Sequence, residues 1–335
     1  MPQHVGLHSR YAAAWSDWGL GRAVWWAAAL LQPHAVVVPG DMLDEGARCS
    51  DAQHAQLLER FQAVFRARRE ARWSTTLPIS ARSIPLILTA GNHDQPPPSP
   101  PDSARDSVDA ARARSLAAFG GDSCTCVRGH VIHSIDTSGL FYDGEDEQSA
   151  GWSVCDGVSC AQHGHHVVVT HAPLFRRSDS VCGKERGQGG GVTYLERDAA
   201  MAEGRDVLAE RDSVLLMQTA HAAAQLMGRH VSIVLSGHTH APCFITSSAH
   251  SIGSNRSVLH ATLSASGWRM RPDASCALLL LHERATDGSV ILPLPLPHEH
   301  FCIAVVAVAC VAVVAAACVV ARSTWCSVRR RRKAN

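Results

Sequence analysis

Four short polar motifs, each directly after an apolar run of strand character, constrain the fold of this chain more than any other feature. The motifs are GDMLDEG at 40–46, GNHD at 91–94, THAP at 170–173 and GHTH at 237–240, and the runs before them are HAVVV, IPLILT, HHVVVT and VSIVLS. Short runs rich in Val, Ile and Leu that end in turn residues are typical of buried strands. Because every motif brings His, Asp or Asn to a strand end, the sequence predicts that the four motifs meet in one polar pocket.

The rest of the pattern alternates strands with helices. Strand-like runs lie at 35–38, 84–89, 130–135, 166–170, 231–235, 258–263 and 277–282, and helical segments at 19–31, 51–71, 103–118 and 205–227. This alternation predicts a layered α/β or α+β domain. We expect that domain to occupy residues 1–282 and to be followed by a polar, proline-broken linker over 283–300.

The C-terminal end predicts a membrane segment. Residues 301–321 are 21 consecutive apolar residues, enough for a helix to span roughly 30 Å of hydrocarbon. A buried core helix is the alternative, but such helices rarely lack a polar face. The basic tail over 322–335 contains no acid, which favours a cytoplasmic tail and a body in the lumen or outside the cell. Its last residues, RKAN, also resemble the dibasic signal through which coat proteins retrieve membrane proteins to the endoplasmic reticulum.

Charge and cysteine content narrow the class further. The chain has 31 Lys and Arg against 30 Asp and Glu, and removing the six bases of the tail leaves a mildly acidic body. An acidic body argues against a nucleic-acid-binding surface. Eight of the twelve cysteines lie in this body, and an even number permits disulfides in an oxidising compartment. The tight spacing of Cys124 and Cys126 favours bridges or structural thiols over a zinc site.

The residue types in the motifs match the needs of phosphoester hydrolysis. Two divalent cations roughly 3.5–4 Å apart acidify a water molecule and offset the charge that develops on the phosphoryl oxygens. One carboxylate has to bridge such a pair, and Asp41 suits that position. Asn92 offers an amide oxygen, His171 and His238 offer imidazole nitrogens, and His240 can face the other cation.

Two further motif residues fit roles other than metal ligation. His93, beside the amide ligand, is better placed to donate a hydrogen bond to the phosphate or to the leaving oxygen. Asp94 would then orient His93 from behind. The remaining histidines have no comparable context and are interpreted as polar surface or satisfied interior groups: His130, His133, His163, His165, His166 and His221.

The four motifs resemble the second to fifth motifs of the calcineurin-like metallophosphoesterases. More narrowly, the chain is similar to the metallophosphoesterase 1 family in LLQPHAVVVPGDMLDEG (30–46), FQAVF (61–65), THAPLFRRSD (170–179), VLSGHTHAPC (234–243) and SGWRMR (266–271). The DEG ending at 44–46 separates it from the Ser/Thr protein phosphatases, whose motif reads DRG and pairs with GNHE. The resemblance covers most of residues 20–280.

This resemblance implies a fold, a cofactor and a substrate. The fold would be a four-layer sandwich of two mixed β-sheets flanked by helices, with manganese-type cations, or zinc or iron, at the strand ends. The activity would be removal of ethanolamine phosphate from the second mannose of GPI anchors in the endoplasmic reticulum and Golgi, which supports export of GPI-anchored proteins. Arg176 and Arg177, together with Trp268 and Arg269, are candidates for contact with the phosphate or the glycan.

One departure from the family pattern concerns the N-terminal end. The family opens its domain with a D-x-H motif whose Asp and His bind the first metal, whereas this chain begins MPQHVGLH. His4 alone stands in a comparable context, and the Asp position would be Pro2. The first metal would therefore keep only the shared Asp41 and His240. Two interpretations follow: the sequence lacks its N-terminus, or the first site has been lost.

These interpretations leave several functions open. The leading hypothesis is a membrane-anchored two-metal phosphodiesterase. The second is a catalytically impaired adaptor of the same fold that binds GPI-anchored cargo, and the third is a phosphodiesterase acting on another lipid or a nucleotide. The pocket motifs alone do not separate the substrates, because the whole superfamily shares them.

Overall fold

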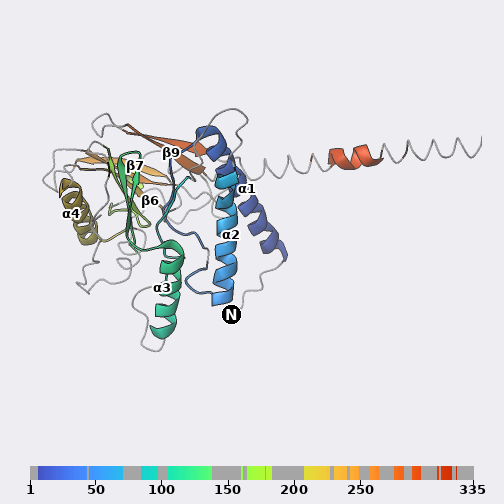
Figure 1. Ribbon diagram of the computed structural model, residues 1–335, viewed down its shortest axis with the longest axis horizontal. Coiled ribbons are helices and arrows are strands. Elements are labelled where there is room, and N and C mark those ends of the chain that lie inside the picture. The colour runs from blue at the N-terminus through green and yellow to red at the C-terminus, as the bar shows by residue number, and fades with distance from the viewer. Residues whose placement is uncertain are drawn as a thin grey trace, which may run out of the picture.

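The computed structural model describes the chain in segments. These are residues 7–43, 45–70, 84–96, 105–137, 160, 164–177, 179–182, 207–226, 230–239, 242–248, 257–263, 275–282, 289–295, 308, 311–318 and 322. Figure 1 shows the arrangement of the elements, with strands between two groups of helices.

A six-stranded mixed sheet forms the centre of the fold. Its strands are β3 (Ser123–Val127), β4 (His130–Ile135), β5 (His166–Thr170), β6 (Val231–Ser236), β8 (Ser257–Thr262) and β7 (Cys243–Ser248), in that spatial order. The four inner strands run parallel, and the edge strands β3 and β7 pair antiparallel to their neighbours. Strands buried on both faces are expected to read as continuous apolar runs, as VVV in β5 and IVL in β6 do.

A second strand layer covers one face of this sheet. It consists of a parallel pair, β1 (Val36–Val38) with β2 (Leu86–Leu88), and an antiparallel pair, β9 (Ser275–Leu281) with β10 (Ser289–Pro295). Ile87 of β2 joins the inner sheet's Val167 and Ile233 in one apolar cluster, which β9 extends through Leu279 and Leu281. The predicted second mixed sheet is thus, in the described residues, two separate two-stranded sheets.

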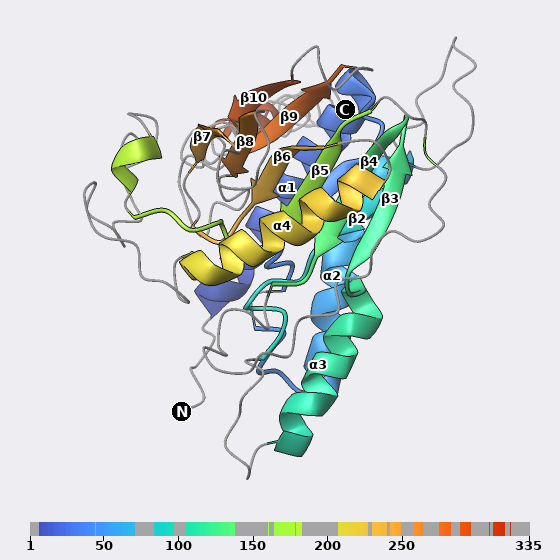
Figure 2. The ribbon, with the colours of Figure 1, turned by 90° about the vertical axis from the view of Figure 1, so that its left-hand side faces the viewer.

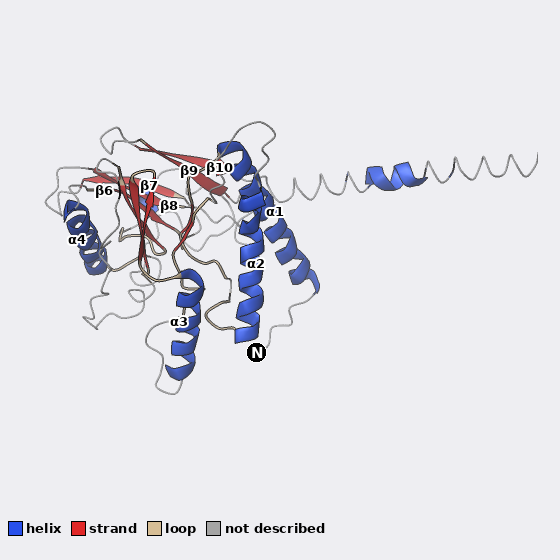
Figure 3. Ribbon diagram, viewed as in Figure 1, coloured by secondary structure: helices blue, strands red, loops and turns tan. Residues whose placement is uncertain are grey.

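Helices form the two outer layers. Helix α4 (Glu210–Leu226) packs Leu216 and Ala220 against Val168 and Val234 on the other face of the six-stranded sheet. Helices α1 (Leu7–Leu31) and α2 (Asp51–Glu70) lie on the opposite side of the molecule (Figures 1 and 2). Figure 3 shows both strand layers between these helices. The α/β class with a mixed sheet is therefore confirmed.

Helix α3 (Arg105–Phe119) and a short helix complete the fold. Phe119 of α3 meets Phe61 of α2 edge to face. The one-turn helix η3 (Asp179–Cys182) follows the THAP motif and is fastened to β7 by a disulfide between Cys182 and Cys243. A second disulfide joins Cys126 to Cys160, and Cys124 is also disulfide-bonded. The prediction of bridges over a zinc site at Cys124 and Cys126 is confirmed.

The linker predicted over 283–300 is wrong in part. Residues 289–295 form β10, which pairs along its whole length with β9, so the globular fold reaches at least Pro295. The sequence did not predict this strand because it contains two prolines, Pro293 and Pro295. Proline removes one backbone donor and is tolerated on an edge strand. Among the strands that the structure describes, β10 pairs with β9 alone.

The C-terminal predictions fall largely outside the described residues. Of the apolar stretch 301–321, the structure describes residues 308 and 311–318, which are helical, and of the basic tail 322–335 it describes Arg322. Within the described parts of the chain, no helix combines the length and apolarity needed to cross a bilayer. The membrane helix stays a prediction.

Candidate metal centre

Four loops carry the predicted ligands to one edge of the two strand layers. Asp41 follows β1 and Asn92 follows β2, while His171 follows β5 and His238 follows β6. Parallel pairing places the carboxyl ends of β1 and β2 together, and likewise those of β5 and β6. The backbone of Gly237 donates to the His171 carbonyl over 2.9 Å and holds the last two loops side by side.

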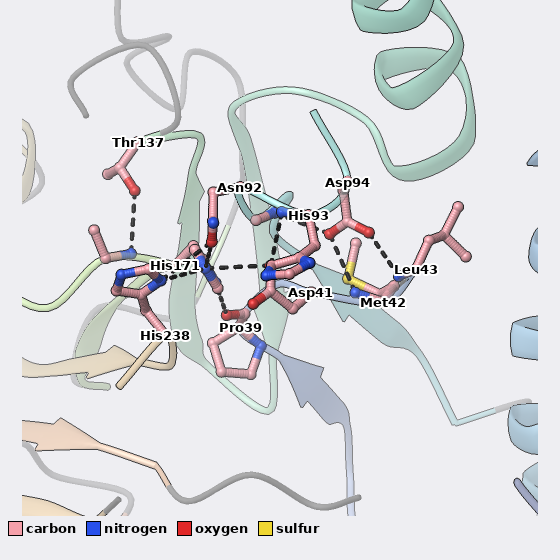
Figure 4. A network of polar contacts seen from close by, with 12 residues as sticks. Pro39, Asp41, Met42, Leu43, Asn92, His93, Asp94, Thr137, His171 and His238 are labelled. Carbon is pink, nitrogen blue, oxygen red and sulfur yellow. Dashed lines mark hydrogen bonds and ion pairs between the residues drawn. The ribbon is translucent and has the colours of Figure 1, made fainter. Parts of the chain in front are cut away.

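The four side chains converge on one point (Figure 4). The amide oxygen of Asn92 lies 2.9 Å from His171 Nε2 and 3.1 Å from His238 Nδ1. These two imidazole nitrogens are 3.2 Å apart, and Asp41 Oδ1 lies 3.4 Å from His171 Nε2. The structure thus brings Asp41, Asn92, His171 and His238 together, although 197 positions separate the first from the last.

Hydrogen bonding fixes the ring of His171 with a lone pair toward the cluster. Its Nδ1 lies 2.8 Å from the carbonyl oxygen of Pro39, which can only accept, so Nδ1 carries the proton and donates. In the neutral ring Nε2 is then an acceptor, and it faces the oxygens of Asn92 and Asp41. Converging acceptors repel one another unless a cation lies among them. Histidine nitrogens with carboxylate and amide oxygens suit manganese, zinc or iron, and a backbone partner behind the histidine is usual at such sites.

The backbone at the cluster adopts left-handed conformations. The φ angle is 54° at Asp41 and 64° at His238, and such angles in non-glycine residues cost of order 1–3 kcal/mol each. Both residues are thereby turned so that their side chains reach the common point. Strain of this kind persists only where the surrounding structure holds it, and it is typical of functional sites.

Three glycines make room for the ligands. A Cβ atom on Gly40 would collide with the ring of His171, and one on Gly91 would lie 2.8 Å from Cε1 of His171 and closer still to the carboxylate of Asp41. A Cβ atom on Gly237 would lie 2.7 Å from the carbonyl oxygen of Pro39. Each of these three motifs therefore requires glycine at this position, because any larger residue would displace a ligand or the backbone that holds it.

Asp94 fastens two of the loops to each other. Its buried carboxylate accepts hydrogen bonds from the backbone amides of Leu43 (2.7 Å), Met42 (3.1 Å) and Gly91 (2.9 Å). Burial, and next the charge of Asp41, raise the pKa of Asp94 to about 6, against the opposing effect of these three donors. The sequence had assigned Asp94 to orienting His93. Its hydrogen bonds hold the GDMLDEG loop against the GNHD loop, and the orienting of His93 stays a prediction.

Asp41 and His93 lie at the mouth of the cluster. The backbone amide of His93 donates to Asp41 Oδ1 over 3.1 Å, and the His93 side chain is exposed beside it. Burial acts to raise the pKa of Asp41. The positive charges that His171, His93 and His238 carry when protonated, together with the hydrogen bond from the His93 amide, outweigh burial and leave that pKa below the ordinary value. Asp41 is therefore an anion, as a metal ligand must be.

The other predicted site residues are placed as follows. His4, His240, Trp268 and Arg269 lie outside the described residues, and Arg177 is exposed. Arg176 is buried, and its Nη1 lies 3.5 Å from Oγ1 of Thr262 at the end of β8. That hydroxyl also accepts from Ser236 over 3.2 Å, directly before the GHTH loop. Arg176 thus contacts the strand ends beneath the site, and its contact with the phosphate or the glycan stays a prediction.

Sequence reasoning missed the backbone that shapes the centre. The carbonyl of Pro39 and the three glycines carry no ligand, yet PGD, AGN and SGH in the motifs were the available signal. Four of the histidines that the sequence set aside, His130, His133, His165 and His166, are buried groups with hydrogen-bond partners. His133 Nε2 and His166 Nδ1 are 2.9 Å apart, and His130 Nδ1 accepts from the His165 amide over 3.0 Å. Burial lowers the pKa of His133 to about 4.

Fold and site together define a metal-dependent phosphoesterase. The model of the calcineurin-like phosphoesterase family matches residues 7–242, more than half of the chain, and the chain belongs to that family.

Relatives narrow the resemblance further. The chain is 27% identical over 312 residues to metallophosphoesterase 1 of Ailuropoda melanoleuca, covering 88% of this chain and 69% of that protein. It is 27% identical to metallophosphoesterase 1 of Pongo abelii over 68% of this chain and 54% of the relative. A 78-residue segment is 38% identical to the metallophosphoesterase 1 homolog of Drosophila melanogaster. The chain spans about half the length of most of these relatives.

Purple acid phosphatase from yellow lupin seeds superposes with a TM-score of 0.45 at 14% sequence identity, covering 82% of this chain and 48% of that one.

Proposed function

We propose that this phosphoesterase is a divalent-metal-dependent phosphodiesterase that removes ethanolamine phosphate from the second mannose of GPI anchors. The observation that carries the chemistry is the convergence of Asp41, Asn92, His171 and His238 on one point. The substrate is supported by similarity to proteins named metallophosphoesterase 1. Family membership supplies the hydrolase class, and the particular diester is our proposal.

The ligand atoms of the cluster indicate where divalent cations would bind. Asp41, Asn92, His171 and His238 would hold one cation, and Asp41 would share a second with His240, as the motif pattern implies. Bound divalent cations supply Lewis-acid polarisation of the phosphoryl group and a water of lowered pKa. Manganese is the cation we propose, with zinc or iron as alternatives.

The protein's own residues would position the diester and its leaving group. His93 is exposed at the mouth, and its backbone amide donates to Asp41 Oδ1 over 3.1 Å. From there it would donate a hydrogen bond, and then a proton, to the oxygen that leaves phosphorus. Asp94 holds the loop that carries His93 against the loop that carries Asp41. The exposed Arg177 would offer a positive charge to the phosphate or glycan.

We also propose a location and partners. Disulfides between Cys126 and Cys160 and between Cys182 and Cys243 support a body in an oxidising compartment. With the predicted helix 301–321 in the bilayer, this body would lie in the lumen of the endoplasmic reticulum or Golgi. GPI-anchored proteins would be its substrates, and coat proteins would recognise the terminal RKAN in the cytosol.

Hydrolysis of bis-p-nitrophenyl phosphate tests the chemistry. The full chain in detergent, loaded with Mn²⁺, should release p-nitrophenol, and Asp41→Asn should abolish release. Asp17→Asn is the matched control, because Asp17 lies on α1 and pairs with Arg60 away from the site. Wild-type turnover without metal, or unchanged turnover in Asp41→Asn, would contradict the proposal.

The substrate needs a separate measurement. In cells lacking the endogenous activity, the wild type should remove ethanolamine phosphate from a GPI-anchored reporter, read by mass spectrometry of the glycan, and Asp41→Asn should not. Turnover of the synthetic diester without any change in the glycan would leave the phosphodiesterase standing and reject the GPI substrate.

A catalytically impaired adaptor of the same fold, which binds GPI-anchored cargo, is the second candidate. The adaptor hypothesis predicts that neither the wild type nor Asp41→Asn hydrolyses the diester, and that both support export of GPI-anchored reporters.

A further inference from the structure

The antiparallel pair β9–β10 is apolar on both faces. Leu279, Leu281 and Ile291 point inward and pack against the cluster between the strand layers. On the opposite face Leu280 and Val290, which are register partners, are 46% and 49% exposed. An antiparallel ribbon at a protein surface ordinarily alternates apolar residues inside with polar residues outside. An outer face of this composition is typical of a surface that another body covers.

Helix α1 adds aromatic and aliphatic side chains beside this face. Its C-terminal end lies next to β9 and β10 in both Figures 1 and 2. There Trp26 is 54% exposed and Leu30 is 72% exposed. The ring of Trp26 meets that of its neighbour Trp25 edge to face, with ring centroids 4.6 Å apart.

We define the α1–β10 patch by the six exposed apolar side chains on these elements: Trp26, Leu30, Leu31, Leu280, Val290 and Leu292. No acid belongs to it. The one acidic residue of α1, Asp17, is paired with Arg60 of α2 at 2.7 Å. Within the described residues of α1, β9 and β10, no acid without a basic partner remains to repel phospholipid headgroups.

The length of chain after β10 indicates what covers the patch. β10 ends at Pro295, and the predicted membrane helix begins at residue 301. The six steps from Pro295 to residue 301 reach at most about 20 Å, so a helix inserted from 301 would hold the Pro295 end of β10 within that distance of the hydrocarbon. Tryptophan and aliphatic side chains that reach the membrane interface gain by entering it.

We propose that the α1–β10 patch docks on the surface of the bilayer that the chain's own C-terminal segment enters. Docking would fix the orientation of the body and leave α4 facing away from the lipid. The inference goes beyond the proposed function: it depends on the predicted helix 301–321 and not on the chemistry of the metal centre.

An environment-sensitive fluorescent amino acid placed at single positions tests the docking. Dansylalanine at position 280 reports the patch, and at position 215 it reports the matched control, because Leu215 is 45% exposed on the outer side of α4. The full chain is reconstituted in phosphatidylcholine vesicles containing phosphatidylserine and lipids with a nitroxide near the headgroup. We expect blue-shifted emission and nitroxide quenching at 280, and neither at 215.

Charge variants add a second readout. Val290→Glu should reduce the quenching at 280, whereas Val214→Glu, at an exposed valine of α4, should not. Equal quenching at 280 and 215 would overturn the proposal, as would a chain that fails to float with the vesicles. A blue shift at 280 that grows with protein density and ignores the nitroxide lipids would assign the patch to a second copy of the chain, and would equally overturn it.

Discussion

Replacing Gly91 with alanine is the most discriminating perturbation of the metal centre, because it changes no ligand. The added methyl carbon would lie 2.8 Å from Cε1 of His171 and closer still to Oδ1 of Asp41, whereas ordinary contact begins near 3.4 Å. One or both ligands must therefore move by at least about 0.6 Å. Metal–ligand distances hold to within about 0.2 Å, so the displaced ligand no longer fits the shared cation.

The expected loss follows from that displacement. Loss of one ligand from the cation should lower the affinity for Mn²⁺ by at least about 100-fold, which corresponds to about 2.7 kcal/mol of binding free energy. Isothermal titration calorimetry with Mn²⁺ measures the affinity, and hydrolysis of bis-p-nitrophenyl phosphate should fall in parallel. The far-ultraviolet circular dichroism of the variant should match the wild type, since only the loop is crowded.

Gly121→Ala is the matched control. Its added methyl would meet only Leu116, at 3.6 Å, which is ordinary contact. We expect metal affinity and turnover equal to the wild type. If Gly91→Ala bound Mn²⁺ as tightly as Gly121→Ala, the packing of Asp41 and His171 around Gly91 would not be what holds the site.

Three further predictions concern stability. First, Asp94→Asn should cost about 2–4 kcal/mol in urea unfolding and weaken metal binding, because an amide cannot accept all three backbone bonds that the carboxylate accepts; an unchanged midpoint would contradict this. Second, burial lowers the pKa of His133 to about 4, so the folded state disfavours the charged ring. The contribution of the neutral ring to the free energy of unfolding is therefore complete above about pH 6.5. It falls as the pH drops toward 4, by about 2 kcal/mol at pH 5. His133→Gln should flatten that part of the stability profile, and a profile as steep as that of the wild type would refute the assignment. Third, removing the Cys126–Cys160 disulfide, which spans 34 positions, should cost about 4 kcal/mol of unfolding free energy, and equal unfolding midpoints of the Cys126→Ser/Cys160→Ser variant and the wild type would argue against it.

The strands that carry the site could be predicted from sequence because burial leaves a strong pattern. The runs before Asp41, Asn92, His171 and His238 are uninterrupted apolar segments, since their strands lie between other layers. Their carboxyl ends meet at one edge as parallel pairing requires. The ligand residues could be named for the same reason: each follows directly on such a segment.

Edge strands could not be predicted in the same way. β3 reads SCTCV, β7 reads CFITSS and β10 contains two prolines, so each lacks the continuous apolar run of an inner strand. An edge strand has one neighbour and tolerates polar residues and proline. The sequence therefore predicted the inner strands of the fold and missed edge strands, including β10 within the predicted linker.

Roles that depend on a partner far along the chain were also beyond reach. Asp94 was assigned to His93 because they are neighbours in sequence, whereas its amide partners Met42 and Leu43 lie 52 and 51 positions away. Arg176 looked like a surface cation in a basic pair, but folding turns it inward toward Thr262. Spacing alone does not show which way such a side chain points.

A crystal of the protein soaked in Mn²⁺ and measured at a wavelength of strong manganese anomalous scattering tests the central claim most directly. We predict an anomalous peak about 2.0–2.3 Å from the ligand atoms of Asp41, Asn92, His171 and His238, and no peak there in Asp41→Asn. Density for manganese elsewhere, or none within reach of these four side chains, would contradict it.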